Sequence, residues 1–428
     1  MGKWLGNTPQ LIWLYKSNYA ATPPKLILPF GCLHDVFKMA GTDVVFERGF
    51  SKVRPVDFIS TATLYDYQED MVQKALKQKN GVIIMPCGSG KTQTAVELIC
   101  RVSLPTLWIT HTTELLNQSM TRFKENVVVN SGEVGTITGG KINIGSHITF
   151  ATIQTLSKID LEPFRDTWGM IVVDECHHAI GAPTRVMQFY SVLSILPARY
   201  KIGLTATPTR ADGLEKAMFA LLGDTIGIVE KKQLEDKIVP VVVMLKTTGY
   251  KPNMREITDS AGIINHVKAL TVLTEDDDRN CVIAVQIKEL YEDGHSVLVL
   301  SDRVKHLKIL HDLSSIPESI AVSGTGSVSE KKDRSLAVQK MKDGKLKVMF
   351  ATYALAKEGL DIPRLDVLVF TTPKTDMATI TQACGRVARS FDGKETGFVY
   401  DYVDDHSIYT RMLGKRRTCY KKNGYQVM

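Results

Sequence analysis

The 428-residue sequence lacks an apolar run long enough to cross a membrane, and its start, MGKWLGNTPQ, lacks the charged beginning and apolar core of a signal peptide. Its seven cysteines are an odd, scattered set without a CxxC pair. This distribution argues against a disulfide framework and a zinc site, and it favours reduced thiols. We therefore expect a cytoplasmic protein that does not associate with a membrane.

Positive charge is only mildly in excess, with a net charge of +7 and a pI near 8.8. A polyanion-binding protein and an ordinary slightly basic surface both fit this balance. Hydrophobic residues make up 44% and charged residues 23% of the chain, as in a soluble globular protein. The length suffices for two or three domains with proper cores.

The chain changes its pattern twice. Residues 1–60 carry short apolar pieces broken by prolines and glycines, which indicates a small mixed α/β or mostly β domain. This part has seven Lys/Arg against four Asp/Glu, with Trp4, Trp13, Tyr15 and Tyr19 among them. The sequence is compatible with two roles for this part: a domain that binds nucleic acid, and a docking lid whose core is formed by the aromatic residues.

From residue 61 on, strands alternate with helices, which is typical of doubly wound parallel sheets. We expect one such α/β domain over 61–232, a charged connector at 229–237, and a second over 233–428 with a polar insertion at 246–280. In the insertion, the acidic run 275–278 favours a solvated helix face or loop over a metal site. Predicted strands are 81–85, 106–110, 147–151, 170–173, 200–205, 238–245, 296–300, 319–322, 347–351, 367–371 and 397–400.

The stretch GVIIMPCGSGKTQT (81–94) predicts a phosphate-binding loop between a buried strand and a helix. The backbone N–H groups of Gly88, Ser89 and Gly90 and the helix N-terminus suit an anion, Lys91 suits the outer phosphates, and the Thr92 hydroxyl suits Mg²⁺. The pattern departs from the general one at Met85, where glycine is usual.

The stretch MIVVDECHH (170–178) predicts a second buried strand that delivers Asp174 and Glu175 at its carboxyl end. An aspartate at that place in a phosphate-loop enzyme holds Mg²⁺, and the adjacent carboxylate can orient or deprotonate the attacking water. Three consecutive residues cannot all point at one metal, so the following Cys176 and histidines do not indicate zinc.

GSGKT, DECH, TATP (205–208) and QACGRVAR (382–389), in this order, resemble the motifs of superfamily 2 helicases and translocases. LTATPTRADG (204–213) resembles the XPB-type and phage branch-migration (UvsW-like) helicases more than the DEAD-box RNA helicases. The resemblance extends from about residue 62 to the C-terminus. It implies two tandem RecA-like domains that hydrolyse ATP with Mg²⁺.

The resemblance also implies roles for single residues. Gln68, in LYDYQ, looks like the adenine-reading glutamine, and Gly359 and Asp361, in ATYALAKEGLDIP (351–363), resemble residues that reach nucleotide from the second domain. Gln382, Arg386 and Arg389 match the motif that supplies arginine fingers. His177, Thr205 and Thr207 are similar to elements that couple the nucleotide site to nucleic acid. Further matches are to nucleic-acid-contacting segments, at His111, Thr112, Gly139, Lys141, Thr152, Arg303 and Thr352.

The spacing of the two arginines predicts that Arg386 and Arg389, one helical turn apart, face one γ-phosphate. Guanidinium groups stabilise the phosphoryl transition state and are worth about 10³–10⁵ in rate. For the Thr- and Ser-rich loops after strands, phosphate contact and ordinary helix capping are both compatible with the sequence. For Cys87, Cys176 and Cys384, we favour small core fillers over reactive thiols.

These observations predict an ATP-dependent DNA helicase or translocase acting on branched, forked or duplex DNA, with strand separation or branch migration as its work. An RNA helicase and an ATP-switched nucleic-acid-binding or annealing protein are the alternatives. We expect a monomer that works with other replication or recombination proteins, in the host cytoplasm if phage-encoded. Polarity, preferred DNA structure and pathway do not follow from the sequence.

Overall fold

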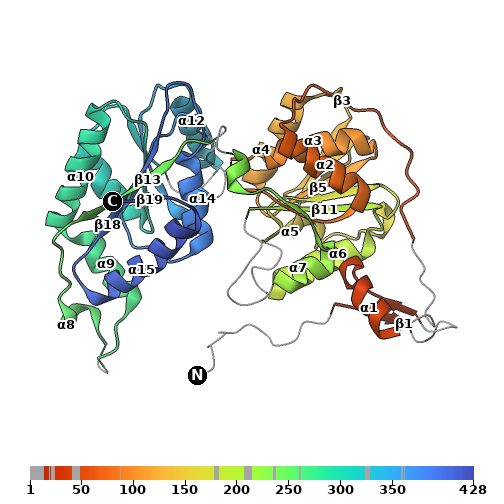
Figure 1. Ribbon diagram of the computed structural model, residues 1–428, viewed down its shortest axis with the longest axis horizontal. Helices are drawn as coiled ribbons and strands as arrows, with labels where there is room; N and C mark the ends of the chain where they lie inside the picture. The colour runs from red at the N-terminus through yellow and green to blue at the C-terminus, as the bar shows by residue number, and fades with distance from the viewer. Residues whose placement is uncertain are drawn as a thin grey trace. The chain divides into compact units, whose positions relative to one another are not determined.

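The computed structural model describes residues 14–18, 20, 25–40, 49–86, 88–177, 183–206, 215–234, 238–259, 262–322, 328–357, 360 and 362–428. The chain divides into two compact units between Gln233 and Leu234 (Figure 1). Each unit has one large sheet of mainly parallel strands covered by helices on both faces. The predicted α/β architecture of two parallel-sheet domains is therefore confirmed.

The first unit contains an eight-stranded sheet of order β12-β4-β11-β10-β5-β9-β7-β8, parallel except for the β7–β8 hairpin. The strands are β4 (Asn80–Ile84), β5 (Thr106–Thr110), β7 (Val134–Thr138), β8 (Lys141–Asn143), β9 (Ile148–Thr152), β10 (Met170–Val173), β11 (Tyr200–Thr205) and β12 (Thr225–Ile228). The central strands are buried along their whole length, as a parallel sheet covered on both faces requires.

Successive side chains of these strands enter two different cores. Val82, Leu107 and Ile171 pack with residues of α6 (Pro183–Ile195) and α7 (Glu215–Leu222). On the other face, the Phe150 ring packs at a tilt against Trp108 and edge to face against Phe123 of α4 (Thr113–Asn126). The helices α2 (Asp66–Gln78) and α3 (Lys91–Val102) cover that same face, as Figure 1 shows.

The described residues before position 61 belong to the first unit. They form β1 (Lys16–Asn18), β2 (Lys25–Ile27), the 3₁₀ turn η1 (Phe30–Cys32), α1 (Leu33–Ala40) and β3 (Ile59–Ser60), which pairs with β6 (Val127–Val128). η1 lies against α7 so closely that a Cβ on Gly31 would collide with the carbonyl of Phe219. Trp4, Trp13 and Tyr19 lie outside the described residues, whereas Tyr15 is exposed.

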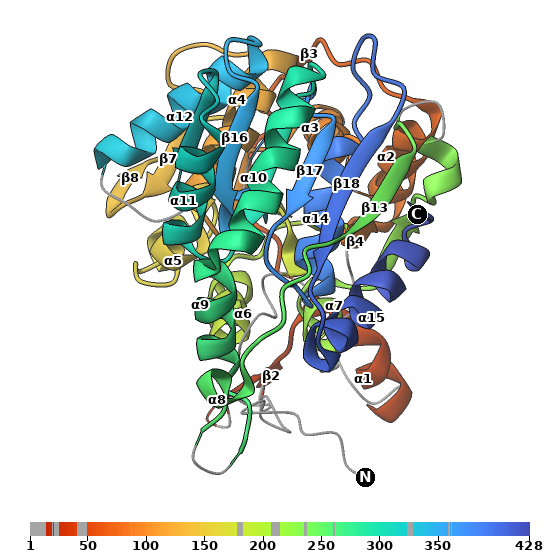
Figure 2. The same ribbon diagram turned by 90° about the vertical axis from the view of Figure 1, so that its left-hand side faces the viewer.

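The second unit contains a seven-stranded, all-parallel sheet of order β15-β16-β14-β17-β18-β13-β19 (Figure 2). Its strands are β13 (Val241–Thr247), β14 (Val297–Ser301), β15 (Ser319–Val322), β16 (Val348–Thr352), β17 (Val367–Phe370), β18 (Gly397–Val403) and β19 (Gln426–Val427). Its helices are α8 (Met254–Ile257), α9 (His266–Glu275), α10 (Asp277–Glu292), α11 (Val304–Ser314), α12 (Val328–Lys342), α13 (Tyr353–Lys357), α14 (Met377–Val387) and α15 (Ser407–Lys422).

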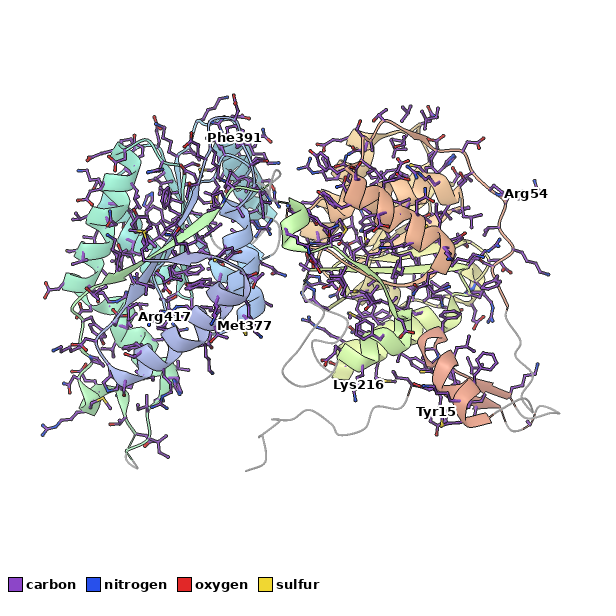
Figure 3. All side chains as sticks on the ribbon, viewed as in Figure 1. Tyr15, Arg54, Lys216, Met377, Phe391 and Arg417 are labelled. Carbon is purple, nitrogen blue, oxygen red and sulfur yellow. The ribbon has the colours of Figure 1, made fainter. Side chains whose placement is uncertain are left out.

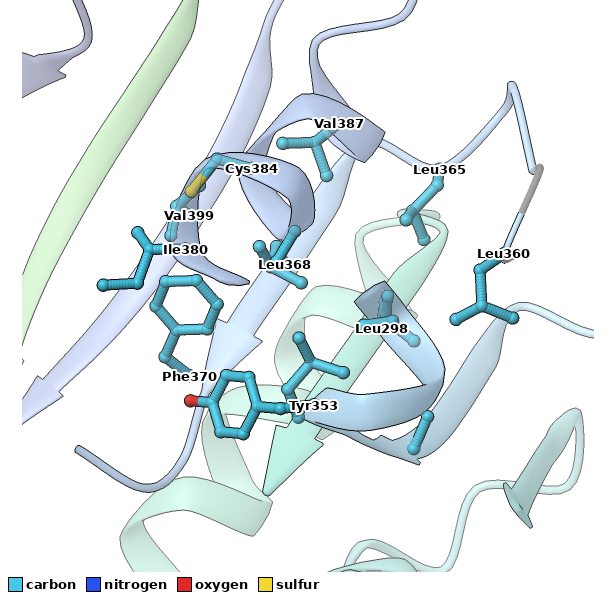
Figure 4. Packing of buried hydrophobic residues seen from close by; sticks show 14 of the residues in the cluster. Leu298, Tyr353, Leu360, Leu365, Leu368, Phe370, Ile380, Cys384, Val387 and Val399 are labelled. Carbon is cyan, nitrogen blue, oxygen red and sulfur yellow. The ribbon is translucent and has the colours of Figure 1, made fainter. Parts of the chain in front are cut away.

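The alternation of side chains again separates two cores. Val297, Val299 and Phe350 face α10 and α11, whereas Leu298 and Phe370 face α13 and α14. Figure 4 shows the second core, in which Tyr353, Ile380 and Cys384 pack around Phe370. Cys176 of the first unit is also fully buried, so both of these thiols are core fillers; Cys87 lies outside the described residues.

The acidic run of the polar insertion joins two helices. Glu275 ends α9, the Asp276 carboxylate caps α10 by accepting from the N–H of Arg279 at 2.8 Å, and Asp277 and Asp278 lie in the first turn of α10. Carboxylates there stabilise a helix through its dipole. Among the described residues, no group of His, Cys, Asp or Glu has the arrangement of a metal-binding cluster, and no helix is long and apolar enough to cross a membrane.

Candidate active site

The phosphate-binding loop connects β4 to α3 at the carboxyl edge of the first sheet. Gly88 and Gly90 have φ of 83° and 77°, the left-handed region that favours glycine. A Cβ on Gly90, the N-cap of α3, would also collide with the side-chain amide of Gln68. Lys91 and Thr92 follow as the first two residues of α3, so the helix N-terminus opens toward the loop.

The segment LYDYQ holds this loop in place. The Gln68 Oε1 accepts from the N–H of Tyr65 at 2.9 Å, which caps α2, and its Nε2 donates to the carbonyl of Ser89 at 3.0 Å. The Tyr67 hydroxyl donates to the same carbonyl at 3.2 Å. Gln68 is buried, and its side chain serves both the cap of α2 and the phosphate loop. Its predicted role in reading adenine stays a prediction.

Met85 shows why glycine is not needed at its position. It directly follows β4, is fully buried, has no positive φ, and its N–H donates to the carbonyl of Thr205 at 2.9 Å. Its own carbonyl accepts from the Lys91 ammonium at 3.4 Å. Met85 therefore continues the sheet edge, and the glycines that the loop needs for its turns come later.

Asp174 and Glu175 follow β10 at the same edge, as predicted. The Glu175 carboxylate lies 3.8 Å from the Lys91 ammonium, so the loop lysine and the carboxylate pair converge. Glu175 has φ of 47°, a strained conformation for a residue with a side chain, and such strain clusters at functional sites. The charge of the Glu175 carboxylate acts on the neighbouring Asp174.

Ser119, in the middle of α4, supports the aspartate. Its hydroxyl donates to Asp174 Oδ2 at 3.0 Å, while Asp174 Oδ1 accepts from the N–H of Glu175 at 3.0 Å. Burial, followed by the charge of Glu175, raises the pKa of Asp174 to about 6; Lys91 and the two hydrogen bonds act in the opposite direction. No sequence signal points to Ser119, because it is an unremarkable serine within a helix.

The carboxylate pair connects to the next motif through a buried hydrogen bond. His177 Nδ1 lies 3.0 Å from Thr205 Oγ1, at the end of β11, and 3.3 Å from Glu175 Oε2. Gly203 makes room for this segment, since a Cβ there would come within 2.9 Å of the Cys176 sulfur. The structure thus brings together His177 and Thr205, two of the three residues predicted to couple the nucleotide site to nucleic acid.

The predicted nucleic-acid residues of the first unit continue along the same sheet edge. His111 and Thr112 follow β5, and Thr152 ends the neighbouring strand β9 in register with Thr110. The His111 carbonyl accepts from Gln154 at 2.8 Å, and the Thr112 hydroxyl caps α4 by accepting from the N–H of Leu115 at 3.3 Å. Thr112 is therefore an N-cap residue, as the helix-capping alternative predicted.

Gly139 and Lys141 lie farther along this edge, in the β7–β8 hairpin. Gly139 and Gly140 form its turn with φ of 58° and 79°, and Lys141 is exposed at the start of β8. Because β4, β11, β10, β5, β9 and β7 are parallel neighbours, their motifs form one row from the phosphate loop to this hairpin. The residues predicted to bind nucleotide and those predicted to contact nucleic acid therefore lie along one edge of the same sheet.

In the second unit, Thr352 and Arg303 lie at the carboxyl edge of adjacent strands. Thr352 ends β16 in register with Ser301 of β14, and Arg303 caps α11 two residues later. The Thr352 hydroxyl is buried and has no hydrogen-bond partner within the described residues. Arg303 is half-buried and donates to the carbonyl of Val267 at 3.4 Å.

The arginine prediction needs a correction. Gln382 and Arg386 lie on α14, but the helix ends at Val387, and Arg389 pairs in an isolated antiparallel bridge with Ile238. Arg389 therefore does not lie on α14 with Arg386: the C-cap residue Ala388 keeps αR backbone angles, and the bridge with Ile238 begins at Arg389. That both arginines face one γ-phosphate stays a prediction. Arg386 donates to the Ala356 carbonyl at 3.3 Å, which ties α14 to α13.

Three predicted residues, Thr207, Gly359 and Asp361, lie outside the described residues. Thr92 and Asp174 are the residues that would hold Mg²⁺. The buried Asp174 carboxylate with its raised pKa, beside a second carboxylate, fits such a use, since a divalent cation relieves the repulsion between them. Bound there with phosphate, Mg²⁺ would neutralise developing negative charge.

Fold and site together define a phosphate-loop nucleotide hydrolase with two parallel-sheet units. The family model described as "Type III restriction enzyme, res subunit" matches residues 61–210, and "Helicase conserved C-terminal domain" matches residues 280–391. A protein of Acanthamoeba polyphaga mimivirus, named as an ATP-dependent RNA helicase, is 31% identical over 402 residues, covering 91% of this chain and 75% of that protein.

The "DNA 3'-5' translocase XPB2" of Sulfurisphaera tokodaii is 25% identical over 389 residues, covering 83% of this chain and 84% of that protein. Among solved structures, "ATP-dependent Type ISP restriction-modification enzyme LlaBIII bound to DNA" is similar with a TM-score of 0.59 and 16% identity, over 85% of this chain and 30% of that one. The chain belongs to the superfamily 2 helicases. It is accordingly an ATP-hydrolysing enzyme that acts on nucleic acid.

Proposed function

We propose that this protein is an ATP-dependent DNA helicase or translocase that couples hydrolysis to strand separation or branch migration on duplex or branched DNA. The observation that carries the proposal is the single row of motifs along the first sheet. Lys91 and Glu175 lie 3.8 Å apart, His177 after β10 is hydrogen-bonded to Thr205 of the neighbouring strand β11, and His111 and Thr152 lie at the ends of β5 and β9 on the other side of β10. The residues predicted to contact nucleotide and those predicted to contact nucleic acid thus share one sheet edge, along which a change at the phosphate loop can be passed on.

In this proposal, Lys91 and the loop N–H groups bind the phosphates of ATP, and Glu175 orients and deprotonates the attacking water. Asp174 and Thr92 hold Mg²⁺. Arg386 and Arg389 of the second unit, in the motif that also holds Gln382, supply positive charge to the transferring phosphoryl group, and Gly359 and Asp361 reach the nucleotide from the same unit. Catalysis then depends on closure of the two units, which makes ATP binding and release a cycle of motion.

DNA rather than RNA is favoured by two similarities. The match over 61–210 is to a restriction-enzyme subunit family, and one relative is named as a DNA translocase. The mimivirus protein, which is named as an RNA helicase, favours the alternative. We further propose a monomer that acts in the cytoplasm with other replication or recombination proteins.

ATPase activity with single-stranded, duplex, forked and four-way DNA, and with RNA of matched sequence, tests the choice of substrate. The proposal predicts the largest stimulation by branched or duplex DNA. Stimulation by RNA alone would instead support the RNA helicase. Equal rates with and without every nucleic acid would remove the proposed function altogether.

The rival reading, an annealing protein in which ATP is only a switch, is separated by Glu175→Gln. This change keeps the shape of the side chain but removes its charge. We expect ATP binding to persist while hydrolysis and unwinding are both lost. Full function of the variant would support the switch.

A further inference from the structure

Helix α15 carries a basic surface that the active-site residues do not use. Its nine exposed positions are all polar or glycine, and none is acidic. Five of them are cationic, namely Arg411, Lys415, Arg417, Lys421 and Lys422. None of these five forms an ion pair within the described part of the chain. Figure 3 shows the helix with Arg417 labelled.

Three of the cations lie in one line. Arg411, Lys415 and Lys422 are four and seven residues apart, which places them within about 40° of one another around the helix. The line they form, here called the basic stripe, is about 16 Å long at 1.5 Å per residue. Thr418 lies on the same line and adds a hydroxyl that can donate to a phosphate oxygen.

The helix that carries the stripe is firmly anchored. On its buried side, Arg416 donates to Asp401 Oδ2 at 2.7 Å, and the Tyr420 hydroxyl donates to the same oxygen at 2.8 Å. All three side chains are almost fully buried. Cys419 packs beside Thr381 of α14, so α15 rests on the helix that bears Gln382 and Arg386. The stripe is therefore presented to solvent on a rigid support.

The helix itself does not account for these charges. A helix dipole favours cations only in the last turn, which explains Lys421 and Lys422 but not Arg411 or Lys415. Like charges four residues apart, such as Arg411 and Lys415, destabilise a helix. A bound polyanion would relieve that repulsion.

We propose that the basic stripe binds the phosphate backbone of nucleic acid, as a contact separate from the loops at the sheet edges. The proposal rests on the proposed function, since it supplies that enzyme with an additional grip on its substrate. Point charges repeated along a line, without an exposed aromatic residue, suit phosphates rather than bases. The same face has no apolar residue that could enter a lipid bilayer, so a membrane surface does not fit it.

The test is the salt dependence of DNA binding, measured by fluorescence anisotropy with a labelled duplex and the full chain. Each phosphate contact contributes about 0.9 to the slope of log K against log salt concentration. The triple variant Arg411→Ala, Lys415→Ala and Lys422→Ala should therefore flatten the slope by about 2 to 3. The charge-retaining variant Arg411→Lys, Lys415→Arg and Lys422→Arg should keep the slope of the original chain.

A matched control removes three exposed lysines from other helices and turns of the same unit, Lys288→Ala, Lys340→Ala and Lys345→Ala. It should leave the slope unchanged, and every variant should still unfold in one cooperative transition, which shows that it is folded. If the control also flattened the slope, the loss of net charge alone would explain the effect, and the proposal would be overturned. An unchanged slope in the triple alanine variant would also overturn the proposal, and an acidic protein would then be the alternative ligand of the basic stripe. Failure of the original chain to bind any nucleic acid would overturn the proposed function itself.

Discussion

The hydrogen bond from Ser119 to Asp174 gives the sharpest prediction about the active site. Ser119→Ala removes the donor at 3.0 Å and leaves Asp174 buried beside Glu175. A hydrogen bond to a charged group is worth about 1.5–3 kcal/mol, and one pKa unit corresponds to about 1.4 kcal/mol. Since the hydroxyl stabilises the ionised carboxylate more than the neutral acid, its loss should raise the pKa of Asp174 by about one unit.

The expected effect is confined to acidic and neutral pH. With a pKa of about 6, half of Asp174 is ionised at pH 6 in the original chain, whereas in the variant about one tenth would be. Because Mg²⁺ binding needs the ionised form, kcat/KM for Mg-ATP should fall about fivefold at pH 6 and hardly at all at pH 8.5. The acid limb of the pH profile of kcat/KM reports the free enzyme, so it should move up by about one unit.

Ser119→Thr is the matched control, since it keeps the hydroxyl at this buried position. It should retain the acid limb of the original chain even if the added methyl lowers stability. An acid limb that stays in place in Ser119→Ala would refute the assignment of Ser119 as the residue that positions Asp174. A uniform loss of rate at every pH would indicate damage to α4 instead.

Three further predictions concern Gln68, Arg389 and Lys201. Gln68→Ala removes the cap of α2 and one contact to the phosphate loop. It should therefore lower the free energy of unfolding of the first unit by about 1–2 kcal/mol and raise KM for ATP. Denaturant titration followed by the fluorescence of Trp108 and Trp168 measures the loss of stability. Arg389→Ala should retain ATP binding and lose about 10³ in kcat, and unchanged turnover would show that the finger is misassigned. Burial lowers the pKa of Lys201 from 10.5 to about 8. Between pH 8 and 10.5 the unfolded chain therefore holds a proton on Lys201 that the folded chain has lost, so the folded state gains stability as the pH rises. The free energy of unfolding, compared with that of Lys201→Met, should rise by roughly 3 kcal/mol from pH 7.5 to 10.5. A constant gap between the two proteins would contradict that burial effect.

The parallel sheets could be predicted because their strands are short, continuous apolar runs with clear ends. The predicted bounds of β5, β10, β11 and β15 are those observed, and the other predicted strands differ by a few residues at most. In the two large sheets, the strands β7, β8, β12 and β19 were missed, since they are short, partly exposed and without such a run. Their pairing depends on neighbours that are remote in sequence.

The phosphate loop and the Asp174–Glu175 pair were readable because each lies within one contiguous stretch. The contacts between residues of different stretches could not be predicted from the sequence. Ser119 reaches Asp174 across 55 positions, and nothing in its own helix distinguishes it from a capping or solvent-facing serine. The end of α14 was misjudged for a related reason, because the bridge between Arg389 and Ile238 stops the helix from outside. Tertiary contacts decided both features.

The central claim is that hydrolysis at the Lys91–Glu175 site drives separation or movement of DNA strands. The most direct measurement follows a dye-labelled forked duplex and a four-way junction under ATP, with the original chain and with Glu175→Gln at equal DNA occupancy. We expect ATP-dependent strand separation or branch migration by the original chain and none by the variant, although both bind the DNA. Strand movement by the variant, or without ATP, would contradict the claim.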